Sequence, residues 1–235
     1  MVSFIKSIFH LLKIDIKRYP ETDLRRRKKL FEYYKINTIL DVGANQGQYA
    51  LESFKLGFSG KIISFEPIKK VYRTLEKKVA KNASWSSFNL GLGNTSEKLE
   101  INVSENTFSS SILNLKENLV ESAPSSKYIS KEVIEVKKLD DIFNNLIGDG
   151  DVVLLKLDVQ GFEKKVLEGA LKSLDRIRGI QIEMSIEELY EQEPLFNEMK
   201  DFIEGFGFVL HSLENGFYNE KTGKLLQVDG IFFRE

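Results

Sequence analysis

A glycine-containing loop preceded by an acid is the first feature of this sequence whose residue types suit chemistry. Residues 38–42 form a short apolar run rich in β-branched side chains, which predicts a buried parallel strand. Gly43 and Gly47 follow it and allow the backbone to turn tightly and approach a ligand closely. Asn45, between them, is a residue type that tolerates left-handed backbone angles. The loop, with Asp41 just before it, is therefore a candidate cofactor site.

A second acid lies where a ribose-binding carboxylate is expected. Residues 61–66 read as the next strand, which ends in Glu66, 19 residues after Gly47, and Pro67 begins a helix. In doubly wound sheets, ligands bind beyond the carboxyl ends of the strands, where the strand order reverses. An acid at that place accepts hydrogen bonds from both ribose hydroxyls. This arrangement indicates a cofactor that contains adenosine.

Two such cofactors, NAD and S-adenosylmethionine, make different demands on the protein. The pyrophosphate of NAD favours a helix N-terminus without an anion nearby. Here Asp41 precedes the loop and Asp158 ends the strand at residues 152–157, and these negative charges suit a sulfonium and an ammonium. The glycine spacing is not Gly-x-Gly-x-x-Gly, and none of the eight tyrosines has a lysine four residues later, as a short-chain dehydrogenase requires. The residues favour S-adenosylmethionine.

Three charged residues on the later strands are candidates for catalysis. Transfer of the methyl group of S-adenosylmethionine needs alignment of the reactants, and an acceptor that carries a proton also needs a base to remove it. Asp158 is the first candidate base, with a helix N-cap or a cofactor contact as its alternative role. Glu183, at the end of a strand over residues 180–183, is the second candidate base. Lys156 lies on the same side of its strand as Asp158, so we expect it to pair with Asp158 or Glu183, either structurally or to steady charge on the acceptor oxygen.

Four further residues are candidates for substrate binding. Residues 104–131 are rich in Ser and Asn and predict a long loop, which is uncommon without a function. Within it, Ser109 and Ser110 form either a capped turn or a hydroxyl-rich lid over a polar substrate. Tyr190 either stacks on a sugar ring or packs in the core, and His211 is either a base or a core residue.

The composition excludes several classes of protein. The absence of cysteine rules out disulfide scaffolds, thiolate metal sites and thiol nucleophiles, and it suits a reducing compartment such as the cytoplasm. The two histidines, His10 and His211, are far apart, so we expect no histidine-rich metal site. A divalent ion between Asp158, Glu183 and a substrate diol is chemically compatible, but nothing in the spacing demands it. Apolar residues make up 42% of the chain, enough for a real core.

The order of the expected elements predicts a doubly wound α/β fold with a mostly parallel sheet. Two strands at the end of the chain are separated by turn-rich residues and are expected to be antiparallel neighbours at the sheet edge. Residues 98–103 alternate between apolar and polar and predict a half-exposed extension. The strands are expected at residues 38–42, 61–66, 85–90, 152–157, 180–183, 206–213 and 225–233, and the later helices at 163–174 and 194–204.

The motifs at these strand ends are similar to those of a known family. They are Asp41-Val42-Gly43-Ala44-Asn45-Gln46-Gly47-Gln48-Tyr49, Phe65-Glu66-Pro67, Leu90-Gly91-Leu92-Gly93, Lys156-Leu157-Asp158-Val159-Gln160-Gly161-Phe162-Glu163 and Val166-Leu167-Glu168-Gly169-Ala170. Over about residues 36–235 the chain resembles the FkbM-type methyltransferases, a branch of the class I S-adenosylmethionine-dependent enzymes. The resemblance implies a seven-stranded sheet and O-methylation, often of sugars or other hydroxylated metabolites in glycan or natural-product pathways.

The resemblance also implies roles for individual residues in binding the cofactor. Asp41, Gly43, Asn45 and Gly47 would cradle the methionine end of S-adenosylmethionine, and Glu66 would bind the ribose. Leu90 and Gly91 would lie beside the adenine. The remaining cofactor candidates within the matching motifs are Ala44, Gln46, Pro67 and Asp158.

Residues 1–35 match no motif and differ in charge from the rest of the chain. They carry ten Lys and Arg against four Asp and Glu, whereas the remaining residues carry 24 against 31. Phe4, Ile5, Ile8, Phe9 and Leu12 recur at helical spacing, and a second helix is expected from Thr22 or Asp23, with Leu24, Phe31 and Tyr34 on one side and most of the basic run 25–29 in solvent. The first helix either packs on residues 36–235, which we expect to form the methyltransferase domain, or lies on anionic lipid as a peripheral membrane contact.

The sequence thus predicts a cytoplasmic O-methyltransferase that acts on a saccharide or another small polar metabolite. A nucleic-acid methyltransferase is disfavoured because residues 36–235 are acidic, and the motif for amino-group methylation (Asn or Asp, two prolines and an aromatic residue) is missing. A non-catalytic module that docks through its basic N-terminus is the alternative from another class, and the intact glycine loop, Glu66 and Asp158 argue against it. The sequence does not indicate the oligomeric state.

Overall fold

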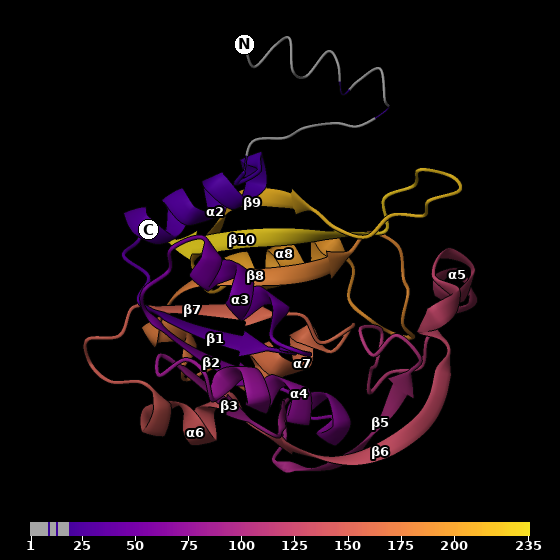
Figure 1. Ribbon diagram of the computed structural model, residues 1–235, viewed down its shortest axis with the longest axis horizontal. Helices are drawn as coiled ribbons and strands as arrows, with labels where there is room; N and C mark the ends of the chain where they lie inside the picture. Colours follow the sequence, from indigo (N-terminus) through magenta and orange to yellow (C-terminus); the bar gives the residue numbers. More distant parts are fainter. Residues whose placement is uncertain (1–8, 10–12, 14–18) are drawn as a thin grey trace.

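The computed structural model describes residues 9, 13 and 19–235 (Figure 1). Apart from Phe9, the helix expected from Phe4, Ile5, Ile8 and Leu12 lies outside the described residues, as does His10. In the part of the chain that is described, no helix is long and apolar enough to cross a membrane.

A seven-stranded sheet forms the centre of the molecule, in the order β3-β2-β1-β7-β8-β10-β9. The neighbours from β3 to β8 are parallel, and β10 is antiparallel to both β8 and β9. The doubly wound fold is therefore confirmed, with the antiparallel pair at one edge. The strands are β1 (Thr38–Val42), β2 (Lys61–Phe65), β3 (Trp85–Phe88), β7 (Val153–Leu157), β8 (Ile177–Ser185), β9 (Phe208–Asn215) and β10 (Gln227–Arg234).

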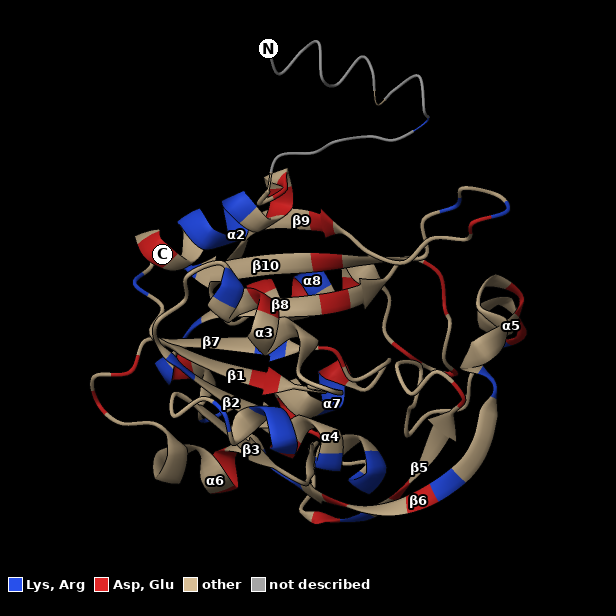
Figure 2. Cartoon of the chain, viewed as in Figure 1, with Lys and Arg blue, Asp and Glu red and all other residues tan. Residues whose placement is uncertain are grey.

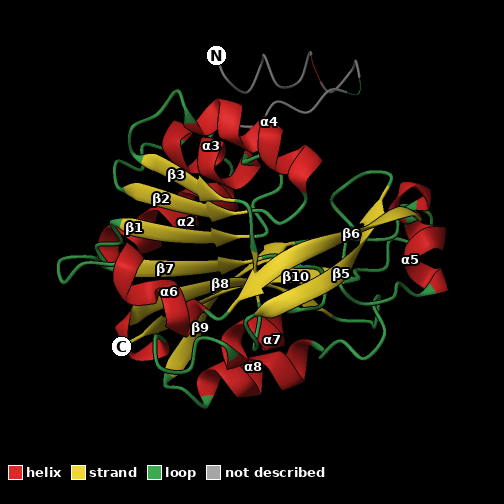
Figure 3. Ribbon diagram, turned by 90° about the horizontal axis from the view of Figure 1, so that it is seen from below, coloured by secondary structure: helices red, strands yellow, loops and turns green. Residues whose placement is uncertain are grey.

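Helices cover both faces of this sheet (Figures 1 and 3). Successive strand residues point to opposite faces, so Ile39 packs in one core and Leu40 in the other. This explains why most residues of the central strands are apolar. One face carries α2 (Thr22–Tyr33), α3 (Gln48–Lys55) and α4 (Lys69–Val79), and the other carries α6 (Leu139–Leu146), α7 (Glu163–Glu168) and α8 (Phe196–Glu204).

Two helices differ from what the sequence suggested. The helix expected over residues 163–174 ends at Glu168, and Gly169 follows it as its C-cap. A Cβ at position 169 would collide with the carbonyl of Gly93, so only glycine fits there. A short 3-10 helix, η2 (Leu174–Arg176), then leads into β8. Helix α6 was not expected, although Leu139 and Phe143, four residues apart, are both buried in the core.

The prediction of a long loop over residues 104–131 is partly wrong. It contains α5 (Glu117–Ser122), the 3-10 helix η1 (Pro124–Ser126) and the start of β6 (Tyr128–Lys137). Strand β6 pairs with β5 (Glu97–Ser104) and β4 (Gly91–Leu92) in a second, three-stranded sheet. Alternate apolar residues of β6, such as Ile134 and Val136, pack against the start of α4. Figure 3 shows this second sheet beyond the carboxyl ends of the central strands.

Helix α2 packs on the sheet as an amphipathic helix should, with one exception. Phe31 is buried, and the ring of Tyr34 stacks on Phe233 with centroids 4.0 Å apart. Most of the basic run faces solvent, as expected (Figure 2). Arg27, however, is buried: it forms ion pairs with Glu214 and, at 2.8 Å, with Glu52. The cost of burying this charge is offset by the two carboxylates.

Candidate active site

A cavity of about 210 Å³ lies at the carboxyl ends of the central parallel strands, where the chain order of the strands reverses between β1 and β7. Ligands of doubly wound sheets bind at this place. Four loops and two strands supply its polar and aromatic lining. The lining includes Gly43, Asn45, Glu66, Pro67, Gly91, Thr107, Phe108, Ser110, Asp158, Gln160 and Glu183.

The glycine loop is held between β2 and β7. Gly43 has a left-handed φ of 77°, and a Cβ at this position would collide with the carbonyl oxygen of Asp158. Its amide and that of Ala44 donate to the carbonyl of Phe65. Asn45 adopts a φ of 47°, as the sequence predicted for the middle of the loop. Gly43 is therefore required for the loop to pack against the strand that carries Asp158.

Glu66 lies at the end of β2 with its side chain buried beside the cavity. Its Oε2 accepts a hydrogen bond from the Asn45 amide at 2.9 Å, and its Oε1 accepts one from the Ile68 amide at 2.8 Å. Burial raises the pKa of Glu66 to about 7, although the two amide donors act in the opposite direction. This carboxyl therefore titrates near neutral pH.

Asp41 does not line the cavity, contrary to the role that the resemblance implied. It is wholly buried, and its Oδ2 accepts a hydrogen bond from Ser64 Oγ at 3.0 Å. Its Oδ1 lies 3.4 Å from Lys156 Nζ. Burial raises the pKa of Asp41, and the nearby lysine partly opposes this. Asp41 thus contacts Ser64 and Lys156 and is not part of the cavity lining.

Lys156 forms the expected pair with Asp158, with 3.4 Å between Nζ and Oδ2. It is buried, does not line the cavity, and lies 5.4 Å from the ring centre of Tyr49. Burial alone would lower the pKa of Lys156, but the carboxylates of Asp158 and Asp41 raise it above its usual value. This lysine therefore stays charged and orients both carboxylates.

Gln160 joins the two candidate bases, although no sequence pattern predicted a role for it. Its Nε2 donates to Asp158 Oδ1 at 2.7 Å and to Glu183 Oε2 at 2.8 Å. Its Oε1 accepts a hydrogen bond from the Tyr190 hydroxyl at 2.7 Å, which fixes the orientation of the amide. A left-handed φ of 57° places the side chain there.

Glu183 is the more deeply buried of the two carboxylates. Burial raises its pKa well above the usual range, and the negative charges of Asp158 and Asp229 raise it further. Gln227 Nε2 also donates to Glu183 Oε2, at 2.9 Å. Asp158, in contrast, has a side chain that is 38% exposed.

Several predicted site residues lie outside the cavity. Tyr190 is fully buried, so its ring is not available for stacking on a sugar; instead its hydroxyl holds Gln160. His211 lies on β9, where Nδ1 donates to the Val209 carbonyl at 2.8 Å and Nε2 accepts from the Tyr34 hydroxyl at 2.7 Å. Both nitrogens of His211 are thus engaged away from the cavity. The other predicted residues that do not line it are Ala44, Gln46, Gly47, Leu90 and Ser109.

Other lining residues were missed from the sequence. Thr107 and Phe108 belong to the loop after β5, and their apolar neighbours Ile101 and Ile134 come from the second sheet. The only sequence signal for them was the unusual length of the segment. Among the described residues, no group of three or more His, Cys, Asp or Glu side chains is arranged to hold a metal ion.

The fold and this cavity define a class I S-adenosylmethionine-dependent methyltransferase. The residues present fit this cofactor: Gly43 and Gly91 line the cavity without side chains, Glu66 presents a carboxyl for ribose hydroxyls, and apolar residues from the second sheet suit an adenine. Asn45 and Asp158 supply polar groups for its methionine end.

Comparisons with known proteins agree with this class. A model of the methyltransferase FkbM domain matches residues 41–210. The 2-O-methyltransferase NoeI of Sinorhizobium fredii (strain NBRC 101917 / NGR234) is 25% identical over 178 residues, which are 73% of this chain and 72% of NoeI. The chain belongs to the FkbM family of methyltransferases.

A solved structure shows the same fold. It is the crystal structure of the methyltransferase FkbM from Methylobacillus flagellatus KT, with a TM-score of 0.51 and 15% identity. The alignment covers 83% of this chain but 43% of that protein, so the present chain spans less than half of its length.

Proposed function

We propose that this protein transfers a methyl group from S-adenosylmethionine to a hydroxyl of a saccharide or another small polar metabolite. The observation that carries this proposal is the Asp158 carboxylate, which lines the cofactor cavity and is oriented by Gln160 and Lys156. A hydroxyl acceptor needs such a group to take its proton as it attacks. The name of the relative NoeI, a 2-O-methyltransferase, also supports transfer to oxygen.

The protein supplies binding and alignment. S-adenosylmethionine, when bound, provides an activated methyl group. Glu66 binds the ribose hydroxyls, Gly91 lies beside the adenine, and the loop from Gly43 to Asn45 accommodates the methionine end. The remaining task of the chain is to hold the acceptor hydroxyl in line and to receive its proton.

We assign the proton transfer to Asp158 rather than to Glu183. Burial and the neighbouring carboxylates raise the pKa of Glu183 well above its usual range, which favours its protonated form, and a protonated carboxyl does not accept the proton of the hydroxyl. Asp158 is partly exposed to the cavity, and its Oδ2 has only the more distant Lys156 ammonium beside it. The proton of the acceptor hydroxyl passes to Asp158, whose carboxylate becomes neutral as it takes the proton. The neighbouring lysine and amide hold the ionised carboxylate in position before this transfer.

We place this reaction in the cytoplasm, in glycan or natural-product biosynthesis. The absence of cysteine suits a reducing compartment, and saccharides with several hydroxyls fit the carboxylates and amide of the cavity.

A methyl-transfer screen with labelled S-adenosylmethionine tests the proposal, with glycans, sugar nucleotides, hydroxylated metabolites and transfer RNA as candidate acceptors. We expect a methyl ether on one of the first three groups. In Asp158→Asn, turnover should fall about 100-fold or more. The affinity for S-adenosylhomocysteine should fall by much less, because the amide of Asn still offers a polar group to the methionine end. A methylated nitrogen or nucleic acid, or full turnover in Asp158→Asn, would overturn the proposal.

A further inference from the structure

Phe108 is an exposed aromatic residue at the cavity. Its side chain lies on the loop between β5 and α5, is 57% exposed and contributes to the lining. A single exposed apolar residue on a protein surface needs no explanation. Phe108 differs because it borders the cavity that contains the candidate base.

The loop that carries Phe108 is held in place on both sides of this residue. Asn106 Oδ1 accepts hydrogen bonds from the Ser109 amide and from Ser104 Oγ, each at 3.0 Å. Asn106 Nδ2 donates to Ser109 Oγ at 3.1 Å. The backbone that presents the aromatic ring is therefore fixed before any ligand arrives, which limits the entropy lost on binding.

The residue before Phe108 adopts an unfavourable backbone conformation. Thr107 has a φ of 63°, and a β-branched residue rarely occupies this region. Its carbonyl accepts a hydrogen bond from Asn45 Nδ2 at 3.3 Å, which ties the loop to the glycine loop of the cofactor site. Strain of this kind persists only where surrounding contacts enforce it, and it concentrates at binding sites.

Several polar groups line the same cavity. Asp158, Gln160, Glu183 and Ser110 provide carboxyl, amide and hydroxyl groups. A pyranose ring has an apolar face of C–H groups, which packs on an aromatic ring, and hydroxyls that bond to carboxylates and amides. The combination of one exposed ring with several polar groups therefore fits a sugar better than it fits an apolar acceptor.

We propose that Phe108 is the platform of the acceptor subsite, on which a pyranose ring stacks while one of its hydroxyls reaches Asp158. This inference rests on the proposed function, because it names the ring that the methyltransferase would recognise. It adds a specificity-determining residue outside the motifs shared with the family. In the competing role, Phe108 covers the methyl donor, and separate measurements of sugar and cofactor binding distinguish the two roles.

The experiment measures sugar and cofactor binding separately in Phe108→Ala and Phe108→Trp. Sugar binding is measured with a panel of methyl pyranosides by saturation-transfer NMR, on protein saturated with S-adenosylhomocysteine. Cofactor binding is measured with S-adenosylhomocysteine by calorimetry. Tyr33→Ala is the matched control, since Tyr33 is a more exposed aromatic residue on α2 and does not line the cavity.

We expect wild type, Phe108→Trp and Tyr33→Ala to bind at least one pyranoside. Phe108→Ala should bind it about tenfold more weakly, as for loss of an aromatic contact, with unchanged affinity for S-adenosylhomocysteine. Equal sugar binding by wild type and Phe108→Ala overturns this inference and leaves the proposed function intact. A loss confined to S-adenosylhomocysteine shows that the ring covers the donor. If wild type binds no pyranoside, the saccharide part of the proposed function fails as well.

Discussion

Lys156 and Asp41 are direct partners on the adjacent parallel strands β7 and β1, and Lys156 Nζ lies 3.4 Å from Asp41 Oδ1. Both side chains are buried. The pair therefore places an ion pair inside the sheet, directly behind the cavity. The same ammonium reaches Asp158, so the charge balance of the core and the position of the candidate base depend on one residue.

Replacing this lysine should be costly for stability. In Lys156→Met, Asp41 is left as a buried carboxyl without a cation, so we expect the free energy of unfolding to fall by about 3–5 kcal/mol. Urea unfolding measures this change. The matched control is Lys61→Met, because Lys61 pairs with Asp151 at 2.6 Å near the surface, where a pair contributes about 0–1 kcal/mol. Equal losses in the two variants would contradict the role assigned to Lys156.

The close packing of Gly43 allows a test with a glycine control. Gly43 and Gly223 have similar left-handed φ angles, 77° and 73°, but a Cβ on Gly223 would meet nothing within 4 Å. Gly223→Ala should therefore show only the backbone cost, about 1 kcal/mol. Gly43→Ala adds the collision with Asp158 and should lose about 3 kcal/mol or more, together with affinity for S-adenosylhomocysteine. If the two variants unfold at the same urea concentration, the collision is relieved by movement of the loop.

Glu66 should make cofactor binding depend on pH near neutrality. Its pKa is raised to about 7 by burial, and the ionised carboxylate is the better acceptor for ribose hydroxyls. The affinity for S-adenosylhomocysteine should therefore increase as pH rises from 6 to 8. In Glu66→Gln it should be about tenfold weaker at pH 8 and nearly constant over this range, as calorimetry would show. A pH dependence that survives in Glu66→Gln would assign it to another group.

The same carboxyl should affect the stability of the free protein with the opposite sign. Because the folded-state pKa of Glu66 lies above its unfolded value, the folded protein binds more protons between pH 4.5 and about 7. The stability that this group contributes is present below pH 4.5 and is lost as pH rises through 7. In Glu66→Gln, the free energy of unfolding measured with urea should decline less steeply with pH. Part of the decline should remain, because burial also raises the pKa of Glu163, to about 8. An unchanged slope in Glu66→Gln would show that its pKa is not raised.

The sequence predicted the central sheet well because the signal there is local. Strands such as β1 are buried on both faces, so each residue from Thr38 to Val42 is apolar or makes specific contacts, and the run stands out. Strand β6 was missed for the opposite reason. It carries four charged residues that do not alternate regularly with apolar ones, and it is defined by its pairing with β5, which lies about 30 residues earlier in the chain.

The site was predicted only in part, and for the same physical reason. Gly43, Glu66 and Asp158 were found because glycine turns and acids at strand ends are local features, and all three line the cavity. The sequence allowed Tyr190 to face either a sugar or the core. The structure shows that it lies in the core, because residues distant in the chain, such as Leu113 and Leu226, pack in the same cluster. Gln160 acquires its role through residues 23 and 30 positions away, which no local pattern reveals.

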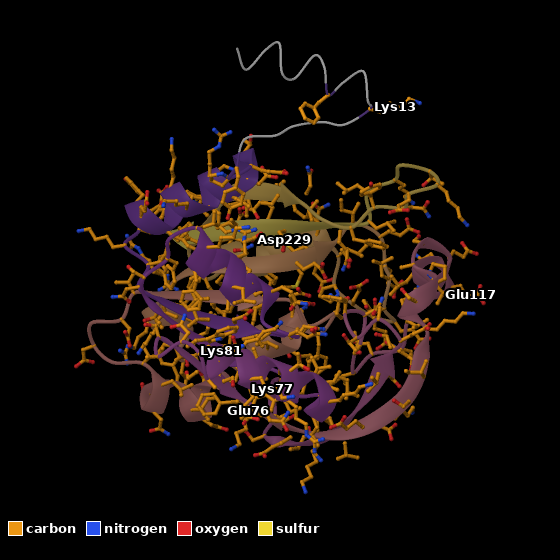
Figure 4. The ribbon with its side chains drawn as sticks, in the orientation of Figure 1. Lys13, Glu76, Lys77, Lys81, Glu117 and Asp229 are labelled. Carbon is orange, nitrogen blue, oxygen red and sulfur yellow. The ribbon has the colours of Figure 1, made fainter. Side chains whose placement is uncertain are left out.

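The peripheral membrane contact expected for residues 1–35 remains a proposal that α2 makes testable. Arg25, Arg26 and Lys29 are exposed on this helix. We expect the full chain to sediment with vesicles of phosphatidylglycerol at low salt. The double variant Arg25→Glu with Lys29→Glu should weaken this binding about 30-fold or more, since it removes two cations and each cation near an anionic surface contributes about 1 kcal/mol. The control is Lys77→Glu with Lys81→Glu, at exposed positions on and just after α4 (Figure 4). Equal effects of both double variants would show that vesicle binding depends on the net charge of the protein and not on a contact made by α2.

The amide of Gln160 should set the pH dependence of turnover. Gln160→Leu removes a hydrogen-bond donor from both Asp158 and Glu183, which favours their protonated forms, so the rate should reach its plateau at a higher pH. We expect turnover at pH 7 to fall about 10- to 100-fold with unchanged affinity for S-adenosylhomocysteine. Tyr190→Phe should give a smaller shift in the same direction, because it only frees the amide to rotate.

Gln227→Leu separates the two carboxylates in this experiment. Gln227 Nε2 donates to Glu183 Oε2 at 2.9 Å and has no hydrogen bond to Asp158. If Asp158 is the base, Gln227→Leu should leave the pH profile of turnover close to that of wild type while Gln160→Leu shifts it. Equal shifts in the two variants would instead assign the role of base to Glu183, because Glu183 is the carboxyl that both glutamines contact.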